Sequence, residues 1–360
     1  MAELLNKDNE KLWTDFTNNL EYIPPQHLIT WMNSIRSSYK NCEPLCYLDT
    51  KDDSATSVFP FFLVKSKIFG NRMISEPFID FGGPLGGFNQ KFFEEIMRDI
   101  KEKFEKELKH IEIRLNNFIP NYEKIEEIFL KYGFRKEVKR HQFILKLEDE
   151  EILWNNFSRI TRKGINKAKK SGLIIREIID ETELKFFYGL YLKSMKNFGT
   201  PQHSYNFFLN LMKDMKENFR GLNCYKEDRL IGSLITFYSK NYMYAAYNFS
   251  EHDSLIYQPN DLLYWEMIIW AIKNGIKYFD FGQCETSAQE GTHAAGIYKF
   301  KKKWNGKLYE RPYFYYSFNK KEEENSEERE KFKKMINIWK MLPLILIKKI
   351  GPKIASELAL

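Results

Sequence analysis

The sequence predicts an α/β protein with two tandem domains of similar design and a helical tail. A chain of 360 residues exceeds the usual size of one domain, and its 43% hydrophobic and 16% aromatic residues suffice for two cores. The order strand, helix, strand occurs twice at a spacing of about 170 residues, which indicates a duplicated α/β (α+β) unit. We therefore expect domains over residues 1–150 and 151–319, and a tail over residues 320–360.

Composition limits the class of protein. The net charge of +7 favours an anionic ligand or surface. Four irregularly spaced cysteines are too few for a disulfide framework, so we expect reduced thiols and a cytoplasmic protein. No apolar run approaches the ~18 residues that cross a bilayer, and no signal-peptide core begins the chain. The histidines and cysteines lack metal-ligand spacing, so no metal is expected.

The first domain combines helices and short strands with a glycine-rich stretch between Gly82 and Gly87. Free backbone amides there could hold an anion, but a tight loop that needs positive φ explains the glycines equally well. The expected elements are helices within 10–40, strands at 45–49 and 58–64, a helix at 91–108, and the first copy of the repeat as strand 111–115, helix 121–131 and strand 137–147.

The second domain contains the stretch around which we expect the site to form. Pro259 begins a helix that Gly275 ends. The strand that follows ends at Gly282, where the chain can turn sharply, and open α/β sheets bind ligands at such strand ends. The expected elements are strand 173–176, helices 181–196 and 204–216, strands 222–226, 230–238 and 242–248, helix 259–274, strand 276–281, helix 296–304 and strand 308–318.

A basic helix face follows the domain boundary, and no acidic residue occurs from residue 157 to residue 175. A solvated surface is one explanation of such a face. Solvated helices usually interleave Glu at i,i+4, however, so the absence of acids favours a polyanionic ligand. Ile160, Gly164 and Ala168 are expected on a different face. The basic face consists of Arg159, Arg162, Lys163, Lys167 and Lys170.

The element order of the second domain resembles the GNAT acyltransferase fold, and five short motifs occur along it in order. Together they resemble the Fem-like (FemAB-related) acyltransferases, most closely the relatives found with bacterial exopolysaccharide and sorting systems. The resemblance implies tandem GNAT domains that transfer an acyl or aminoacyl group to an amine. The motifs are Thr161-Arg162-Lys163, Asn197-Phe198-Gly199-Thr200-Pro201, Pro259-Asn260-x-Leu262-Leu263, Phe279-Asp280-Phe281-Gly282 and Phe300-Lys301-x-x-Trp304.

The resemblance assigns roles to individual residues. Lys301, which follows Phe300, is expected to stabilise the charge that develops at the acyl carbonyl, because an amine attack creates an oxyanion. Its alternative is an ordinary exposed lysine. Asp280 is a candidate base or amine-orienting group, although aspartates at strand ends often bind local backbone. The expected substrate or phosphate contacts are Arg159, Arg162, Lys163, Lys167, Asn260, Gly282, Tyr298 and Trp304; Lys299, Lys302 and Lys303 are expected to bind phosphate or face water.

Three functions remain open. We prefer an N-acyltransferase that carries an acyl group from acyl-CoA to an amine of a small-molecule or lipid-linked envelope or polysaccharide precursor. The second is a transferase that uses aminoacyl-tRNA to extend a peptidoglycan-like peptide, and the third is a non-catalytic binding protein. Ile35 stands where peptidoglycan-building Fem enzymes carry a cation after the tryptophan matching Trp31. In both enzyme hypotheses the donor is a co-substrate, and no cofactor stays bound.

The tail carries an apolar stripe that includes Trp339 and Leu342, then a compact apolar run at 344–347 and lysines. A charge-dense helix is expected before it, at 320–334. Tryptophan, aliphatic residues and lysines suit peripheral contact of residues 328–360 with the inner face of a membrane. Docking on the second domain or on a partner subunit is the alternative, and the oligomeric state stays open.

Overall fold

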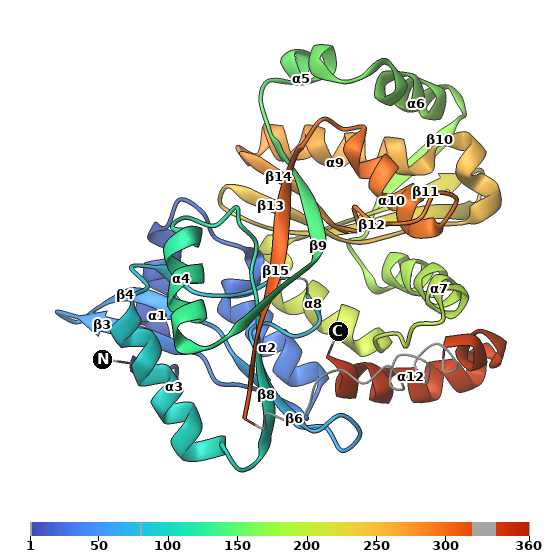
Figure 1. The fold of residues 1–360 in the computed structure, drawn as a ribbon. Helices are drawn as coiled ribbons and strands as arrows, with labels where there is room; N and C mark the ends of the chain where they lie inside the picture. The colour runs from blue at the N-terminus through green and yellow to red at the C-terminus, as the bar shows by residue number, and fades with distance from the viewer. Residues whose placement is uncertain (1, 80, 319–335, 360) are drawn as a thin grey trace. The chain divides into compact units, whose positions relative to one another are not determined.

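The computed structural model describes residues 2–79, 81–318 and 336–359. The chain divides into two compact mixed α/β units, which confirms the predicted fold class (Figure 1). Unit 1 comprises Met1–His141, Tyr309–Arg329 and Lys353–Leu360, and unit 2 comprises Gln142–Leu308 and Glu330–Pro352. The division therefore differs from the predicted boundaries at 150, 319 and 320. The reason is that β15 (Lys307–Ser317) pairs with β8 (Leu108–Arg114), so most of this late strand belongs to unit 1.

Unit 1 has two sheets and an aromatic core. One sheet has the order β15-β8-β6-β5-β2, and the other has the order β1-β3-β4-β7. The expected single strand at 58–64 is interrupted, so that β4 and β5 lie in different sheets. Phe93 and Phe129 pack with ring centroids 4.9 Å apart. The further elements are β1 (Ala2–Leu4), α1 (Glu10–Asn19), α2 (Ile29–Ser38), β2 (Cys42–Pro44), β3 (Tyr47–Lys51), β4 (Ser54–Phe59), β5 (Phe62–Val64), β6 (Asn71–Ile74), β7 (Leu85–Gly86), α3 (Gln90–Phe104) and α4 (Tyr122–Tyr132).

Unit 2 is built on a sheet in the order β10-β11-β12-β13-β14, followed by the end of β9 (Arg135–Lys146). Helices α9 and α7 cover opposite faces of this sheet (Figure 1). The core under α9 includes Leu263, Met267 and Phe281, all of which are completely buried. The elements are α5 (Glu150–Asn156), α6 (Arg159–Lys170), β10 (Leu173–Glu177), α7 (Glu181–Phe198), α8 (Tyr205–Asp214), β11 (Phe219–Lys226), β12 (Arg229–Ser239), β13 (Tyr242–Ser250), α9 (Pro259–Lys273), β14 (Tyr278–Cys284) and α10 (His293–Lys302).

Local sequence signals explain where these helices begin and end. The Ser158 and Thr292 side chains accept hydrogen bonds from backbone amides in the first turns of α6 and α10. Pro259 occupies the first turn of α9, where a missing N–H costs nothing. Gly199 ends α7 in the left-handed conformation, at φ 76°. The predicted strand–helix–strand repeat is confirmed as β8–α4–β9 and β14–α10–β15.

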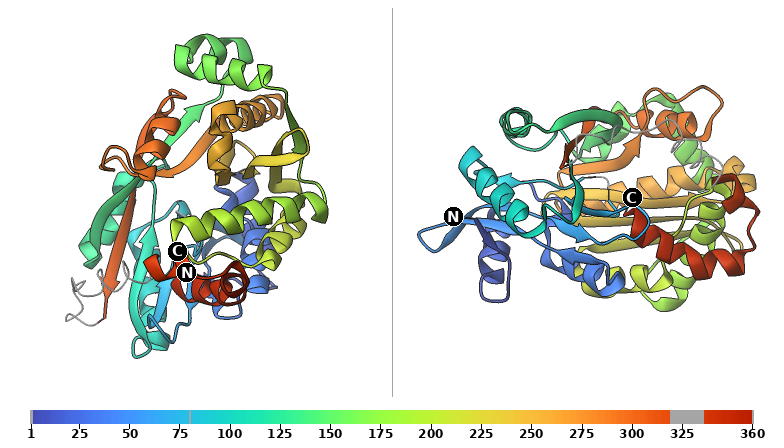
Figure 2. Two further views of the ribbon diagram at one scale, coloured as in Figure 1. Left: turned by 90° about the vertical axis from the view of Figure 1, so that its right-hand side faces the viewer. Right: turned by 60° about the horizontal axis from the view of Figure 1, so that its bottom comes forward.

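The described part of the tail is divided between the two units, and each part makes contacts within its own unit. In unit 2, Gln202 Nε2 donates to the Ile347 carbonyl over 2.8 Å, which ties the start of helix α12 (Leu344–Leu358), the dark red helix of Figure 2, to the segment that follows α7. In unit 1, Arg72 and Arg114 donate to carbonyls of Leu358 and Ala359. The expected helix at 320–334 lies outside the described residues. Among the described helices, none combines the length and apolarity that a membrane span requires.

Candidate functional site

The candidate site of unit 2 forms where the two parallel strands β13 and β14 end their pairing. The register runs from Tyr242 opposite Tyr278 to Tyr244 opposite Asp280. Two residues further along β14, Gly282 adopts φ +75°, and a Cβ there would lie 2.9 Å from the Ala245 carbonyl oxygen. Glycine is therefore required at the predicted turn, because a side chain would be strained and would collide with β13.

Asp280 holds this strand end in place through hydrogen bonds from within the protein interior. Its side chain is completely buried. Oδ1 accepts the Gly282 amide N–H over 2.8 Å, and Oδ2 accepts the Tyr242 hydroxyl over 2.5 Å. The pKa of the neighbouring Tyr264 is raised, first by burial and then by the Asp280 charge. Enclosure by these groups makes Asp280 better suited to positioning Gly282 than to exchanging a proton with a substrate.

Lys301 lies at the same strand end. Its Nζ donates to the Gln283 carbonyl over 2.7 Å and lies 3.3 Å from the position that a Gly282 Cβ would occupy. The side chain is half-buried. Helix α10 thus brings the Lys301 cation to the end of β14, beside Gly282 and the Asp280 that holds Gly282.

Phe300 and Trp304 secure α10 on the core. The Phe300 ring packs 5.2 Å from Tyr264. Trp304 is completely buried, with its ring 5.8 Å from Phe281 and 5.4 Å from Phe157. The structure therefore places Trp304 in the core, where it holds the helix rather than touching a ligand.

Tyr298 and Asn260 also make internal contacts. The half-buried Tyr298 packs 5.6 Å from Phe143. Asn260 Oδ1 accepts hydrogen bonds from Asn248 Nδ2 over 3.0 Å and from Ser250 Oγ over 2.5 Å. Asn260 thereby ties the start of α9 to the end of β13.

An internal ion pair lies at the N-terminus of α9, where the dipole would otherwise favour a phosphate. Lys303 Nζ lies 2.5 Å from Asp261 Oδ1, and their side chains are 16% and 3% exposed. Burial raises the pKa of Asp261, and the Lys303 charge opposes that shift. Lys303, expected to bind phosphate or face water, instead binds Asp261. The carboxylate makes this helix end unfavourable for a phosphate.

Helix α6 packs directly over this ion pair. A Cβ on Gly164 would lie 2.3 Å from Asp261 Oδ1, so glycine permits the close approach. Thr161 Oγ1 donates to the Lys303 carbonyl over 2.6 Å. The buried face of α6 consists of Thr161, Ile165 and Ala168. Ile160, expected on a different face from the charges, is 71% exposed.

The opposite face of α6 is basic and exposed, and Arg159, Lys163, Lys167 and Lys170 lie on it. Arg162 differs from them, because its Nη1 donates to the carbonyls of Trp154 and Asn155 over 3.2 and 3.0 Å. It thereby satisfies the C-terminus of α5. The basic face offers its other cations to an anion.

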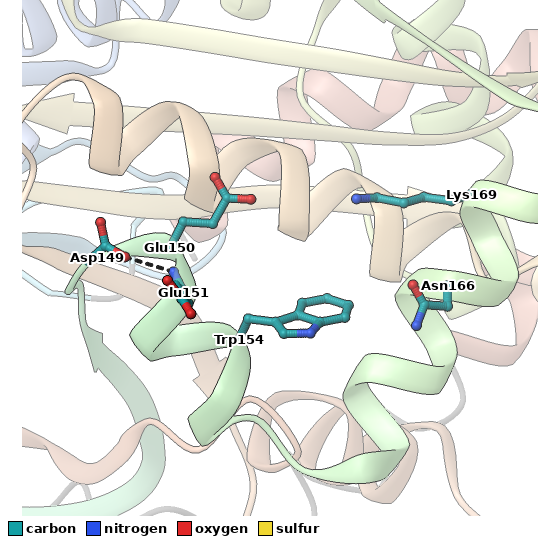
Figure 3. A pocket seen from close by; sticks show the side chains of 6 residues that line it. All are labelled: Asp149, Glu150, Glu151, Trp154, Asn166 and Lys169. Atoms are coloured by element: carbon teal, nitrogen blue, oxygen red, sulfur yellow. Dashed lines mark hydrogen bonds between the residues drawn. The ribbon is translucent and has the colours of Figure 1, made fainter.

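A pocket of about 500 Å³ lies between α5 and α6 (Figure 3). Figure 3 shows the Glu150 side chain toward the end of the pocket near Asp149 and Glu151, and the Lys169 side chain toward the end near Asn166. Lys169 also lies over the Trp265 ring, 5.5 Å from its centroid. Three carboxylates in the lining make this pocket unsuited to a polyanion. The lining consists of Asp149, Glu150, Glu151, Trp154, Asn166 and Lys169.

No metal or thiol chemistry is indicated by the described residues. Over residues 2–79, 81–318 and 336–359, no three His, Cys, Asp or Glu side chains form a group that could hold a metal ion. All four cysteines are free and buried. Burial raises the pKa of Cys42 and of Cys224 to about 12, so these thiols are poor nucleophiles.

Four residues that organise the site were not singled out from the sequence: Tyr242, Tyr264, Asp261 and Gly164. Tyr242 and Tyr264 look like ordinary core aromatics in sequence. Asp261 follows the motif residue Asn260 and reads as a helix-start residue. The only local signal for Gly164 was its position inside a helical pattern, where a glycine can mark close packing against a neighbouring element.

Comparisons with known proteins concern the family of unit 2 and the fold of the chain. Residues 155–302 match the family model described as an acetyltransferase (GNAT) domain. No protein with a curated description matches the chain in sequence. By this domain the chain is an acyltransferase, and GNAT domains use acyl-CoA as co-substrate.

Solved structures show a similar fold over most of the chain. The crystal structure of FemX has a TM-score of 0.71 at 14% identity and covers 88% of this chain and 97% of its own. A tandem GNAT protein from the clavulanic acid biosynthesis pathway has a TM-score of 0.57 at 9% identity, with coverages of 89% and 100%. The C-terminal domain of a putative lysylphosphatidylglycerol synthetase from Agrobacterium fabrum has a TM-score of 0.56 at 10% identity, with coverages of 86% and 91%. The chain thus has the fold of tandem GNAT proteins.

Proposed function

We propose that this protein is an N-acyltransferase that carries an acyl group from acyl-CoA to an amine of a cell-envelope or polysaccharide precursor. The observation that supports it is the position of Lys301. Its ammonium group is held 2.7 Å from the Gln283 carbonyl, beside Gly282 at the end of β14. A cation fixed at the open end of parallel strands is suited to a carbonyl whose oxygen becomes negative.

The chemistry follows from that position. A neutral amine attacks the thioester carbonyl, and its oxygen becomes an oxyanion beside the Lys301 ammonium. The C–N bond forms and the C–S bond breaks; the thiolate leaves with the electron pair and takes up the proton that the amine nitrogen loses, so the products are an amide and free thiol. Gly282 leaves space next to Lys301 Nζ, which lies 3.3 Å from where its Cβ would be. Asp280 holds that glycine through its amide.

The donor phosphates are expected on α6 rather than at the start of α9. The Asp261 carboxylate already lies at the N-terminus of α9, paired with Lys303. Arg159, Lys163 and Lys167 are exposed on the basic face of α6. Replacement of Lys163 and Lys167 by Gln should raise KM for the donor and weaken its dependence on salt.

A panel of acyl-CoA thioesters incubated with amino sugars and amino acids tests the proposal. Release of free thiol that requires both substrates, and that Lys301→Ala reduces, supports an acyl-CoA-dependent N-acyltransferase. Acyl transfer at an undiminished rate in Lys301→Ala would contradict the proposed role of Lys301 in stabilising the oxyanion. A protein that binds an acyl-CoA tightly but never releases thiol is a binding protein on a transferase fold.

The exposed basic face of α6 also favours a second candidate, transfer from aminoacyl-tRNA to a peptidoglycan-like peptide. The helix Arg159–Lys170 presents cations along roughly 18 Å, at about 1.5 Å per residue, a length that suits an RNA backbone. The similarity in fold to FemX is compatible with it. Aminoacyl transfer from charged tRNA that is abolished by ribonuclease would establish this function, and transfer that survives ribonuclease treatment would exclude it. Both reactions would take place in the cytoplasm.

A further inference from the structure

The tail contains the densest run of exposed aliphatic side chains in the described part of the chain. Met341 and Ile345 are 83% and 82% exposed, and Ile338 is 59% exposed. A single exposed aliphatic residue is ordinary, but such a cluster marks an interaction surface. Lesser members of the same run are Ile336, Leu344, Leu346 and Ile350.

The same segment is uniformly cationic. Lys340, Lys348 and Lys349 are exposed, and residues 336–356 contain no Asp or Glu. Ile345 and Lys349 are four residues apart on α12 and therefore share one helix face. The exposed side chains of Ile338, Met341, Ile345, Lys348 and Lys349 are called the tail surface below.

The tail surface is presented by a segment that is fixed to unit 2. Ile347 is completely buried, and its carbonyl accepts the Gln202 Nε2–H over 2.8 Å. Gly199, at the end of α7, lies against Ile336, whose Cγ2 would be 2.6 Å from a Cβ at that position. The docking expected of the tail therefore involves one side of the segment and leaves the tail surface outward.

We propose that the tail surface binds an anionic lipid bilayer in the plane of the interface. Aliphatic side chains between lysines match the acyl boundary and the charged headgroups, and lysine stems can lie along the apolar layer while their ammonium groups reach the phosphates. A second copy of the chain fits less well. In a two-fold dimer the surface would meet itself, and Lys348 and Lys349 of the two copies would face like charges.

Sedimentation with vesicles tests this proposal without any measurement of activity. The full chain should pellet with vesicles of phosphatidylcholine and phosphatidylglycerol at low salt. It should remain in solution with phosphatidylcholine alone, and high salt should release much of it because anionic attraction is screened. Equal binding to both vesicle types, or none to either, would overturn the proposal.

Two pairs of variants separate the contributions. Lys348→Gln/Lys349→Gln should reduce binding roughly tenfold, whereas Lys124→Gln/Lys185→Gln removes the same charge from exposed positions elsewhere and should change it little. Met341→Asn/Ile345→Asn should abolish binding, whereas Ile179→Asn, at a residue that is 75% exposed, should not. Equal loss in a variant and its control would mean that no specific surface binds.

Analytical ultracentrifugation of the same proteins tests whether a second copy of the chain, rather than lipid, occupies the tail surface. A monomer, or an oligomer whose mass is unchanged by Met341→Asn/Ile345→Asn, supports the lipid assignment. An oligomer that this variant dissociates would show that another copy covers the tail surface, and would overturn it. Neither outcome depends on whether the protein proves to be an acyltransferase of the proposed specificity.

Discussion

Lys303 Nζ lies 2.5 Å from Asp261 Oδ1, and this buried ion pair joins the end of α10 to the start of α9 beneath α6. Two positions earlier in sequence, Lys301 donates to the Gln283 carbonyl at the end of β14. Two lysines on one short segment thus take different roles, because helical geometry sends them in different directions. Lys301 is suited to a reacting carbonyl, and Lys303 holds together the helices that position Lys301.

Lys301→Ala should lower kcat by roughly a hundredfold, comparable with the loss of one oxyanion donor, and leave the melting temperature almost unchanged. The half-buried side chain contributes little packing, so the loss should be in the transition state. Steady-state kinetics and thermal unfolding measure the two effects. Lys299→Ala is the matched control, because Lys299 pairs with the highly exposed Glu290 on the protein surface. Equal activity in both variants would contradict the assignment.

Lys303→Met should destabilise the protein by about 3 kcal/mol, because it leaves the Asp261 carboxylate buried without its cation. The double variant Asp261→Asn/Lys303→Met should recover much of that loss, since no buried charge remains. Urea unfolding of the two single variants and the double variant gives the coupling energy. Lys302→Met, at an exposed neighbour, serves as the control. Additive losses would show that the two groups do not interact.

Gly164→Ala should destabilise the protein by about 1–2 kcal/mol, although alanine is the better helix former. The new Cβ would meet Asp261 Oδ1 at 2.3 Å, and the carboxylate is held by Lys303. Gly189→Ala on α7 is the control, because a Cβ there meets nothing within 4 Å. It should be neutral or stabilising by up to about 1 kcal/mol. Chemical denaturation distinguishes them, and a stable Gly164→Ala would refute the close packing of α6 on α9.

The free energy of unfolding should fall as the pH drops, because His27 is buried without a proton charge in the folded protein. Burial lowers the pKa of its ring from 6.5 to about 4, and its Nε2 lies 2.7 Å from the Gly83 carbonyl oxygen. Between those two values the unfolded chain binds a proton that the folded chain does not, so acid favours unfolding by up to about 3 kcal/mol. His27→Gln keeps an amide N–H for Gly83 and should flatten this part of the curve. Urea unfolding across the window checks it, and parallel curves for the two proteins would contradict it.

Much of the fold follows from local sequence. The strand–helix–strand repeat over residues 111–147 and 276–318 was predicted from the order of its elements. That order is visible locally, because a glycine follows each of the two helices, Gly133 and Gly306. The basic face of α6 follows in the same way from helical spacing, which also puts Ala168 on a different face from the charges. Gly282 was expected at a sharp turn, and it has the positive φ that such a turn requires.

The roles of individual side chains depended on tertiary contacts. Arg162 belongs to the basic face by spacing, but the C-terminus of α5 lies close enough to take its guanidinium. Lys303 resembles Lys301 in sequence, yet only the approach of α9 gives it a buried carboxylate.

Strand pairing depended on tertiary contacts as well. Residues 313–317 of β15 pair with a strand about two hundred residues earlier, as Ser317 opposite His110 shows, and β15 from Tyr309 onward belongs to unit 1. The sequence by itself therefore determined most of the elements, because hydrophobic periodicity and capping residues act over a few residues. Its short motifs indicated the class of chemistry through their resemblance to a known family. Only the tertiary structure decided which strands pair and which charges meet, because those choices depend on residues far apart in the chain.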